Sequence, residues 1–298
     1  MKRIPTHTKS RFSSFFFLFI VMCVTVGGYT MFGQPSEYVI PSISLSPQTI
    51  LPGDPVLITI HGTSTPVKVL FDTKELPIFL YEDIPRALAA IDFNEKVLKH
   101  TVKVTLENGE VLTREIVLTP RKKIERPVGI PEKLGGNTPM ASSNLVSNLS
   151  KENAVLASIK STTTQLWSGA FRAPLKHVVV TDDYGYDRKT VEQTIVHKGT
   201  DFRAATGTPV YAMNEGTVTL ARTFTVYGNT IIIDHGLGVH TLYMHLSKID
   251  VKVGDTVKLG DVIGESGMTG YAAAPHLHVS IKVGGVSIDP MVFVGLWE

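Results

Sequence analysis

The stretch HTVKVTLENGEVLTREIVL, residues 100–118, decides the fold class of the N-terminal half of this 298-residue chain. From Val102 to Leu106 apolar residues alternate with polar ones, as in a strand with one buried face. Asn108-Gly109 follows, and a second β-rich run comes after it. Asn-Gly between two such runs is a strong marker of a β-hairpin. The sequence therefore predicts two antiparallel strands joined by a tight turn.

The residues upstream of this hairpin have the same character. Residues 55–62 (PVLITIHG) are rich in β-branched and apolar residues. Several short strands with turns between them predict an immunoglobulin-like β module over residues 46–120. His61 and His100 stand alone in this module, so we assign them no chemistry. A protein partner can dock on the module.

The N-terminus predicts export. Residues 1–33 begin with a basic segment that carries no acidic residue, and an apolar run follows from Phe15 to Phe32. A basic flank before an apolar run is typical of an export signal, with the flank kept inside. The run has about 18 residues, the short end for a membrane span, and no small-x-small cleavage site follows it. An uncleaved signal anchor is favoured over a cleaved signal peptide. We therefore expect a cell-envelope protein on the periplasmic or extracellular face, held at the cytoplasmic membrane.

Composition excludes several classes of protein. The formal net charge is only +2, from 29 basic and 27 acidic residues, so nucleic acid is not the expected partner. Cys23 is the single cysteine. It excludes an intramolecular disulfide and a Cys-rich zinc module, and any metal site must use His, Asp or Glu.

Residues 121–170 are predicted to be a linker with a helix. The first part is rich in Pro, Gly, Lys and Arg. Leu145, Leu149, Leu156 and Ile159 then share one face at helical spacing. This face is expected to pack against a neighbouring domain.

From residue 171 to 298 strands are short, glycines are frequent and histidines are dense. Six of the ten histidines lie between His197 and His278. The segment VHKGTDF places His197 and Asp201 four positions apart, and a glycine between them allows a tight turn. TLYMHLS contains His245, and APHLHVSI contains His276 and His278.

Residues two apart in a strand point to the same face, so His276 and His278 are expected side by side. His197, Asp201 and one histidine of this pair supply two nitrogens and one oxygen. Three protein ligands with an open position form the pattern of a catalytic zinc site, and not of a structural one. The remaining histidine of the pair, together with His245, would lie unligated beside the metal.

From about Lys198 to Pro290 the sequence resembles the lysostaphin-type (LytM-like) zinc metallopeptidases, which cut peptide bonds in bacterial peptidoglycan. The matching stretches are HKGTDFRAATGTPVYAMNEGTV, YGNTIIIDHGLGVHTLYMHLSKI, VKVGDTVKLGDVIGESGMTG, PHLHVSI and SIDP. Their order and spacing fit the family as well. The resemblance implies a mainly antiparallel-β metallopeptidase domain over residues 171–298, with its site in a groove.

The resemblance also implies roles for individual residues. His197, Asp201 and His278 match the zinc ligands, and His245 and His276 match the two catalytic histidines. The implied activity is a zinc metalloendopeptidase that hydrolyses peptide cross-links of peptidoglycan through a zinc-activated water. The roles of general base and oxyanion stabiliser stay open between the two catalytic histidines.

Two departures from the family pattern concern the cleft. Ala273-Ala274 replaces the usual Thr-Gly before Pro-His-Leu-His, and Arg188 stands at a different place from the arginine of the family. The alternative function is a non-catalytic envelope binding protein, or an activator of another cell-wall hydrolase, that uses the groove without cleavage. The complete set of His and Asp residues argues against it. A biotinyl or lipoyl carrier module, suggested by VKVGDTVKLGD, lacks the modified-lysine motif.

Overall fold

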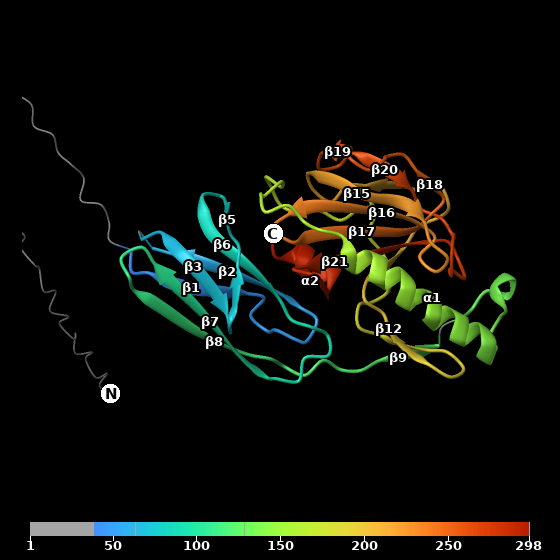
Figure 1. The fold of residues 1–298 in the computed structure, drawn as a ribbon, viewed down its shortest axis with the longest axis horizontal. Helices are drawn as coiled ribbons and strands as arrows, with labels where there is room; N and C mark the ends of the chain where they lie inside the picture. The colour runs from blue at the N-terminus through green and yellow to red at the C-terminus, as the bar shows by residue number, and fades with distance from the viewer. Residues whose placement is uncertain (1–38, 63, 128, 298) are drawn as a thin grey trace, which may run out of the picture. The chain divides into compact units, whose positions relative to one another are not determined.

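The computed structural model describes residues 39–62, 64–127 and 129–297 (Figure 1). The predicted signal anchor or signal peptide, residues 1–33, lies outside the described residues. Within the described part, no helix combines the length and the apolar composition that crossing a membrane requires. The mainly β fold class is confirmed, since strands dominate both halves of this part of the chain.

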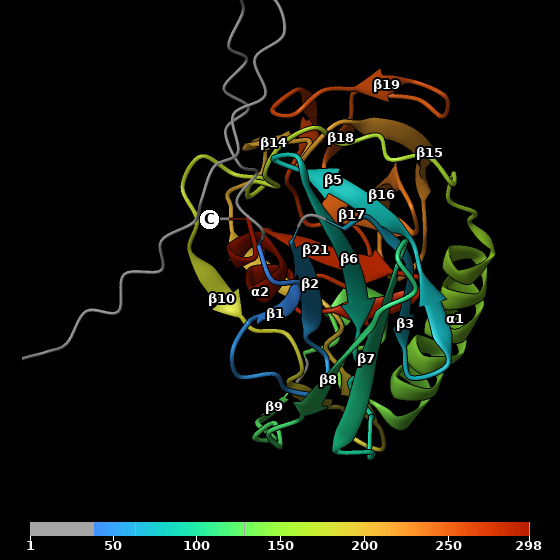
Figure 2. The same ribbon diagram turned by 90° about the vertical axis from the view of Figure 1, so that its left-hand side faces the viewer.

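The N-terminal module consists of two four-stranded antiparallel sheets (Figure 2). Its strands are β1 Ser42–Ser46, β2 Pro55–His61, β3 Pro66–Phe71, β4 Lys74–Leu76, β5 Ile78–Tyr81, β6 Ile84–Ala90, β7 Lys99–Leu106 and β8 Val111–Val117. One sheet has the order β1-β2-β6-β5 and the other β4-β3-β7-β8. Apolar residues from both sheets, such as Ile58 and Val104, share one buried core.

The hairpin predicted from residues 100–118 is confirmed as β7–β8. Val104 lies opposite Leu112. In the turn, the Gly109 N–H donates to Leu106 O, and Gly109 has a φ of +84°, a left-handed conformation that favours glycine. Val102 and Val104 are fully buried, as their alternation with polar residues predicts.

The segment between the module and the second domain is more ordered than a simple linker. It contains β9 Glu125–Pro127, a 3-10 helix at Glu132–Leu134 and α1 Pro139–Ser158. β9 pairs in parallel with β11 (Asp187–Lys189) of the second domain. The predicted helix is confirmed as α1, which begins where Thr138 Oγ1 accepts the N–H of Ala141. Leu145 and Leu156 are buried on its inner face.

The C-terminal domain is built on one large antiparallel sheet of order β10-β13-β21-β17-β16-β15-β19, with β22 paired to β21. Its elements are β10 Val180–Asp182, β11 Asp187–Lys189, β12 Thr194–Val196, β13 Thr200–Arg203, β14 Pro209–Tyr211, β15 Gly216–Thr223, β16 Asn229–Gly236, β17 Val239–Leu246, β18 Lys248–Ile249, β19 Thr256–Val257, β20 Val262–Glu265, β21 His276–Val283, β22 Val286–Ile288 and α2 Pro290–Gly295. Two small sheets, β14-β20-β18 and β12-β11-β9, accompany it.

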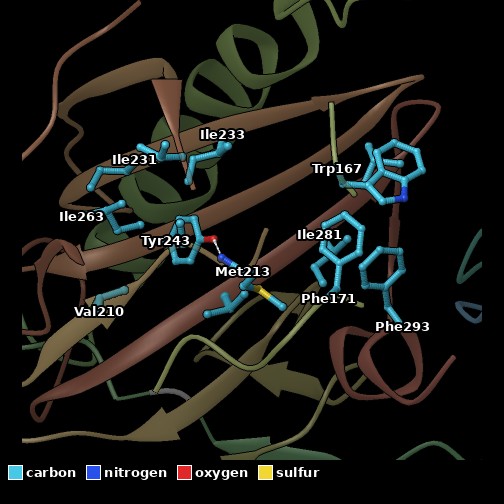
Figure 3. Packing of buried hydrophobic residues seen from close by; sticks show 14 of the residues in the cluster. Trp167, Phe171, Val210, Met213, Ile231, Ile233, Tyr243, Ile263, Ile281 and Phe293 are labelled. Atoms are coloured by element: carbon cyan, nitrogen blue, oxygen red, sulfur yellow. Dashed lines mark hydrogen bonds between the residues drawn. The ribbon is translucent and has the colours of Figure 1, made fainter. Parts of the chain in front are cut away.

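The two faces of the large sheet have different neighbours. Tyr243 and Ile281 face a core that contains Trp167, Phe171 and Phe293, and the Tyr243 hydroxyl accepts the Met213 N–H (Figure 3). On the other face, Leu242 and Met244 pack against Leu156 of α1.

Strand register places the second histidine of the His-x-His pair on the face that carries α1. Met244 is the cross-strand partner of His278, and Leu242 is that of Ser280. Directly opposed residues in an antiparallel pair share a face of the sheet. Leu277 and Val279 alternate to the other face and are fully buried there.

The N-terminal module and the C-terminal domain share buried contacts. Phe79 of β5 packs edge-on against Trp167, with ring centroids 5.1 Å apart. Arg121 forms ion pairs with Asp54 of the module and, at 3.3 Å, with Asp289, which caps the N-terminus of α2. Asp54 is fully buried, so this arginine neutralises a carboxylate that has no access to water.

Candidate metal centre

Three buried side chains that the sequence predicts as metal ligands converge beside strands β13 and β21 of the large sheet. His197 directly follows β12, Asp201 lies in β13, and His278 lies opposite Asp201 in β21. Oδ1 of Asp201 is 3.1 Å from Nε2 of His197 and 2.7 Å from Nδ1 of His278, and the two nitrogens are 3.0 Å apart. One atom from each side chain therefore points at a common position.

In His197 and His278, the hydrogen bond made by the ring nitrogen that faces away from Asp201 determines which nitrogen carries the hydrogen. Nδ1 of His197 lies 2.8 Å from the carbonyl oxygen of Asp183, which can only accept, so Nδ1 is the donor. Nε2 of His278 lies 2.9 Å from Ser280 Oγ, whose own proton is donated to Lys198 O. Nε2 therefore donates as well. The lone pairs of His197 Nε2 and His278 Nδ1 are left to face Asp201.

The electrostatics favour the same protonation states. Burial lowers the pKa of His278 to about 4. At neutral pH the carboxylate is charged and the His278 imidazole is neutral, as metal binding requires.

This donor set fits a zinc ion. Two imidazole lone pairs and a carboxylate oxygen face one another with no proton to separate them, which is repulsive unless a cation lies between them. Tetrahedral zinc, with bonds of about 2.1 Å, spaces its ligands by about 3.4 Å, slightly more than the observed separations. The hydrogen bonds behind each histidine are of the kind that orients zinc ligands. Zinc is the cofactor that this group of His197, Asp201 and His278 indicates.

Gly199 has a different role from the one expected. The sequence suggested that a glycine there permits a tight turn, yet Gly199 is not among the positive-φ residues of the described chain. Space is the constraint instead. A Cβ on Gly199 would lie 2.4 Å from His278 Nε2 and 2.5 Å from Val279 O. Only glycine lets the backbone approach the His278 ring so closely.

The other two predicted site residues lie beside this group. The ring centroids of His245 and His276 are 4.8 Å apart, and Nε2 of His276 is 3.8 Å from Asp201 Oδ1. Nδ1 of each ring donates to a backbone carbonyl, Thr269 O for His245 and Ala274 O for His276. Both Nε2 atoms therefore carry lone pairs.

Burial, together with the neighbouring His276 and His278, lowers the pKa of His245 to about 3. The backbone of His245 is also unusual, with a φ of +60°. Such a left-handed conformation is sparsely populated by residues other than glycine and persists only where surrounding contacts hold it. Ala274, the departure from the family pattern, is not among the positive-φ residues of the described part.

A cavity of about 630 Å³ opens beside the metal-ligand group. His197, His245 and His278 line it. Leu149 of α1 and Tyr227 line it as well, so the helix from the predicted linker forms part of its wall. A cavity of this size accommodates a short peptide segment.

Two residues near the centre were not predicted. Ser280 carries the hydrogen bond behind His278; its position two residues after that histidine in a strand was the available signal. The sequence showed only that Arg188 stands at a different place from the arginine of the family. In the structure its guanidinium donates to both Asp182 and Asp201.

The geometry thus brings together two imidazole nitrogens and one carboxylate oxygen that could hold a metal ion, with two further imidazoles beside them, in an antiparallel β domain. Residues 195–290 match the model of peptidase family M23. Over 95 residues the chain is 45% identical to peptidoglycan DD-endopeptidase ShyA of Vibrio cholerae. This alignment covers 32% of this chain and 22% of that protein. Over 105 residues the chain is 48% identical to glycyl-glycine endopeptidase ALE-1 of Staphylococcus capitis, covering 33% and 29%.

This chain superimposes on the crystal structure of a Pseudomonas aeruginosa protein described as a peptidase M23, with a TM-score of 0.60 and 23% sequence identity. The superposition covers 82% of this chain and 95% of that one, so the shared fold extends beyond the catalytic domain. The chain spans less than a third of the length of the two curated relatives. Residues 195–290 are therefore a peptidase M23 domain, and the lysostaphin-type resemblance of this part of the chain is confirmed.

Proposed function

We propose that this protein is a zinc-dependent endopeptidase that hydrolyses peptide cross-links of bacterial peptidoglycan. The observation that carries the proposal is the meeting of two imidazole lone pairs and one carboxylate oxygen within 3.1 Å of one another. His197, Asp201 and His278 are the proposed ligands. When bound, zinc supplies a Lewis acid that polarises a carbonyl and lowers the pKa of a coordinated water to about 7.

His245 and His276 are the proposed catalytic residues. Each presents an unprotonated Nε2 toward the centre, because its Nδ1 donates to a carbonyl. One imidazole accepts the proton of the attacking water at its Nε2 and returns that proton to the leaving amine as the C–N bond breaks. The other imidazole takes up a proton from solvent at its own Nε2, donates a hydrogen bond to the developing oxyanion and keeps that proton. Both assignments of base and oxyanion stabiliser fit this arrangement.

The names of the relatives suggest two bond types. ShyA is named a DD-endopeptidase and ALE-1 a glycyl-glycine endopeptidase. Either substrate would place this chain at the cell envelope or outside the cell. The N-terminal segment 1–33 would then serve as its signal anchor or signal peptide, and the β module (46–120) as a surface for a protein partner. Residues 121–170 would be a connection with a helix, and residues 171–298 the peptidase.

The test combines metal content with cleavage. Protein lacking residues 1–33 is assayed for bound zinc by elemental analysis and for peptide release from two purified peptidoglycans, one cross-linked directly and one through glycine bridges. About one zinc per chain with release from one of them, both lost in His278→Ala, supports the proposal. A folded protein that binds peptidoglycan without zinc or cleavage would favour the alternative, a non-catalytic binding protein or activator.

A further inference from the structure

A carboxylate on α1 reaches a turn of the catalytic domain. Glu152 is 6% exposed, and no Lys, Arg or His of the described chain forms an ion pair with it. Its two oxygens instead accept backbone N–H groups, Val226 N at 2.8 Å and Tyr227 N at 3.1 Å. The Tyr227 hydroxyl also donates to Asn153 Oδ1 of the same helix. The helix therefore binds this turn at two consecutive backbone amides and one side chain.

The same turn holds the backbone of a proposed catalytic residue. The carbonyl of Tyr227 accepts the N–H of His245 at 2.9 Å, and the carbonyl of Val226 accepts the N–H of Tyr271 at 2.9 Å. Thr269, two residues before Tyr271, accepts the His245 ring through its own carbonyl. Both the main chain and the imidazole of His245 are thus connected to the peptide groups that Glu152 binds.

This connection matters because His245 is in a conformation that does not persist by itself. Its φ of +60° is unfavourable for a residue with a Cβ. Several surrounding contacts must therefore hold the residue in this conformation. The Tyr227 carbonyl is one such contact, and the carboxylate of Glu152 fixes the position of that carbonyl through the preceding amide.

We propose that Glu152 is a positioning residue of the active site, which holds His245 in its left-handed conformation through the turn at Val226–Tyr227. The inference rests on the proposed function in that His245 is taken to act on the proton of the reaction. It also makes α1, which lies outside residues 195–290, a working part of the site. The competing interpretation is that Glu152 merely satisfies two buried amides and contributes only to stability.

The test compares Glu152→Gln and Glu152→Ala in the full chain. The amide oxygen of glutamine can still accept one N–H, whereas alanine accepts none, so the effect should be graded. We expect kcat to fall on the order of 10-fold for glutamine and 100-fold for alanine, the effect of a displaced catalytic group. KM and zinc content should change little. Lys151→Gln, next to Glu152 on the exposed side of α1, is the matched surface control.

Hydrogen exchange provides a readout that does not depend on activity. In Glu152→Gln, amides of segments 224–229, 243–247 and 269–271 should exchange faster than in the wild type, while the β7–β8 hairpin stays unchanged. Ile116→Ala in the N-terminal module supplies a variant with lowered stability but an intact site. If it loses as much kcat as the Glu152 variants, the competing stability interpretation holds and the inference is wrong.

The remaining outcomes separate the two proposals. Wild-type kcat in Glu152→Gln together with unchanged exchange at segment 243–247 overturns the inference and leaves the proposed function intact. A wild-type protein that cleaves no peptidoglycan overturns the proposed function. In that case faster exchange at segment 243–247 in Glu152→Gln still supports the structural connection, and unchanged exchange refutes it. If Glu152→Ala fails to fold, the glutamine variant alone decides.

Discussion

The guanidinium of Arg188 donates a hydrogen bond to Oδ2 of Asp201, while Oδ1 of the same carboxylate faces the two imidazoles of the metal-ligand group. Arg188 also donates to Asp182 at 3.0 and 2.6 Å, and this second carboxylate fixes the plane of the guanidinium. One oxygen of Asp201 is thereby occupied and the other is directed to the metal position.

Replacing Arg188 should weaken metal binding without removing a ligand. A partner behind a metal ligand typically contributes 10–100-fold in affinity, and lysine lacks the planar fork that spans two carboxylates. We therefore expect about 10-fold weaker zinc binding for Arg188→Lys and up to about 100-fold for Arg188→Ala, measured by competition with a chelator. Arg172→Lys, at an exposed position, is the control. Unchanged affinity in Arg188→Ala would contradict this role.

The two proposed catalytic histidines should be separable from the metal by mutation. His245→Ala and His276→Ala each remove an Nε2 lone pair but no predicted ligand. General acid–base groups contribute about 10²–10⁴-fold, so kcat should fall by that range while about one zinc per chain remains. His177→Ala, an exposed histidine, should leave both quantities unchanged. Loss of zinc in His276→Ala would show instead that this histidine is a ligand.

Gly199 should not tolerate even a methyl group. In Gly199→Ala the new Cβ would collide with Val279 O and with Nε2 of His278, neither of which can move without disturbing β21. We expect loss of zinc and a drop in the free energy of unfolding of about 1–3 kcal/mol. Gly169→Ala is the matched control, because nothing lies within 4 Å of its Cβ position. Full zinc occupancy in Gly199→Ala would refute the spatial argument.

His235 should make stability depend on pH. The ring is fully buried, with Nδ1 at 2.6 Å from Glu215 O and Nε2 at 2.8 Å from Thr241 Oγ1. Burial lowers its pKa from 6.5 to about 4. The unfolded chain therefore takes up a proton at a higher pH than the folded one. The stability from neutral His235 is fully present above pH 6.5 and is lost as the pH falls toward 4, by about 3 kcal/mol in all.

The measurement for His235 is urea unfolding of zinc-loaded protein between pH 7.5 and 4.5. Other buried groups titrate in the same range, so the informative quantity is the difference between wild type and His235→Gln. The variant should be less stable at pH 7.5 and lose less stability on acidification. Parallel pH profiles for the two proteins would show that His235 does not control this dependence.

Arg121 should be important for the stability of the two-domain arrangement. It forms ion pairs with Asp54 and Asp289, so Arg121→Ala leaves the buried carboxylate of Asp54 and the partly buried carboxylate of Asp289 without this cation. Breaking a buried pair on one side costs about 3–5 kcal/mol, measured as the loss in free energy of unfolding at pH 7.5. The neighbouring Lys122→Ala, at an exposed position, should change it by less than about 0.5 kcal/mol. Zinc affinity should be the same in both variants.

Several features could be predicted from the sequence because they depend on local patterns. The β7–β8 hairpin follows from alternation and the Asn-Gly turn, and both are properties of adjacent residues. The shared face of His276 and His278 follows from the two-residue period of a strand. The helix that contains Leu145 follows in the same way from helical spacing.

The contacts that complete the site were decided by tertiary structure. Arg188 and Asp201 are 13 positions apart, and Glu152 and Val226 are 74 apart. Such pairs meet only after sheet register and helix docking have formed, and no local period encodes them. By itself the sequence determined the mainly β fold class, the resemblance to the family and the choice of five His and Asp residues as the proposed site, because their spacing is local or matches a known motif. Only the folded structure shows why Gly199 must be glycine and how α1 reaches His245, because both depend on the close approach of segments that are distant in the chain.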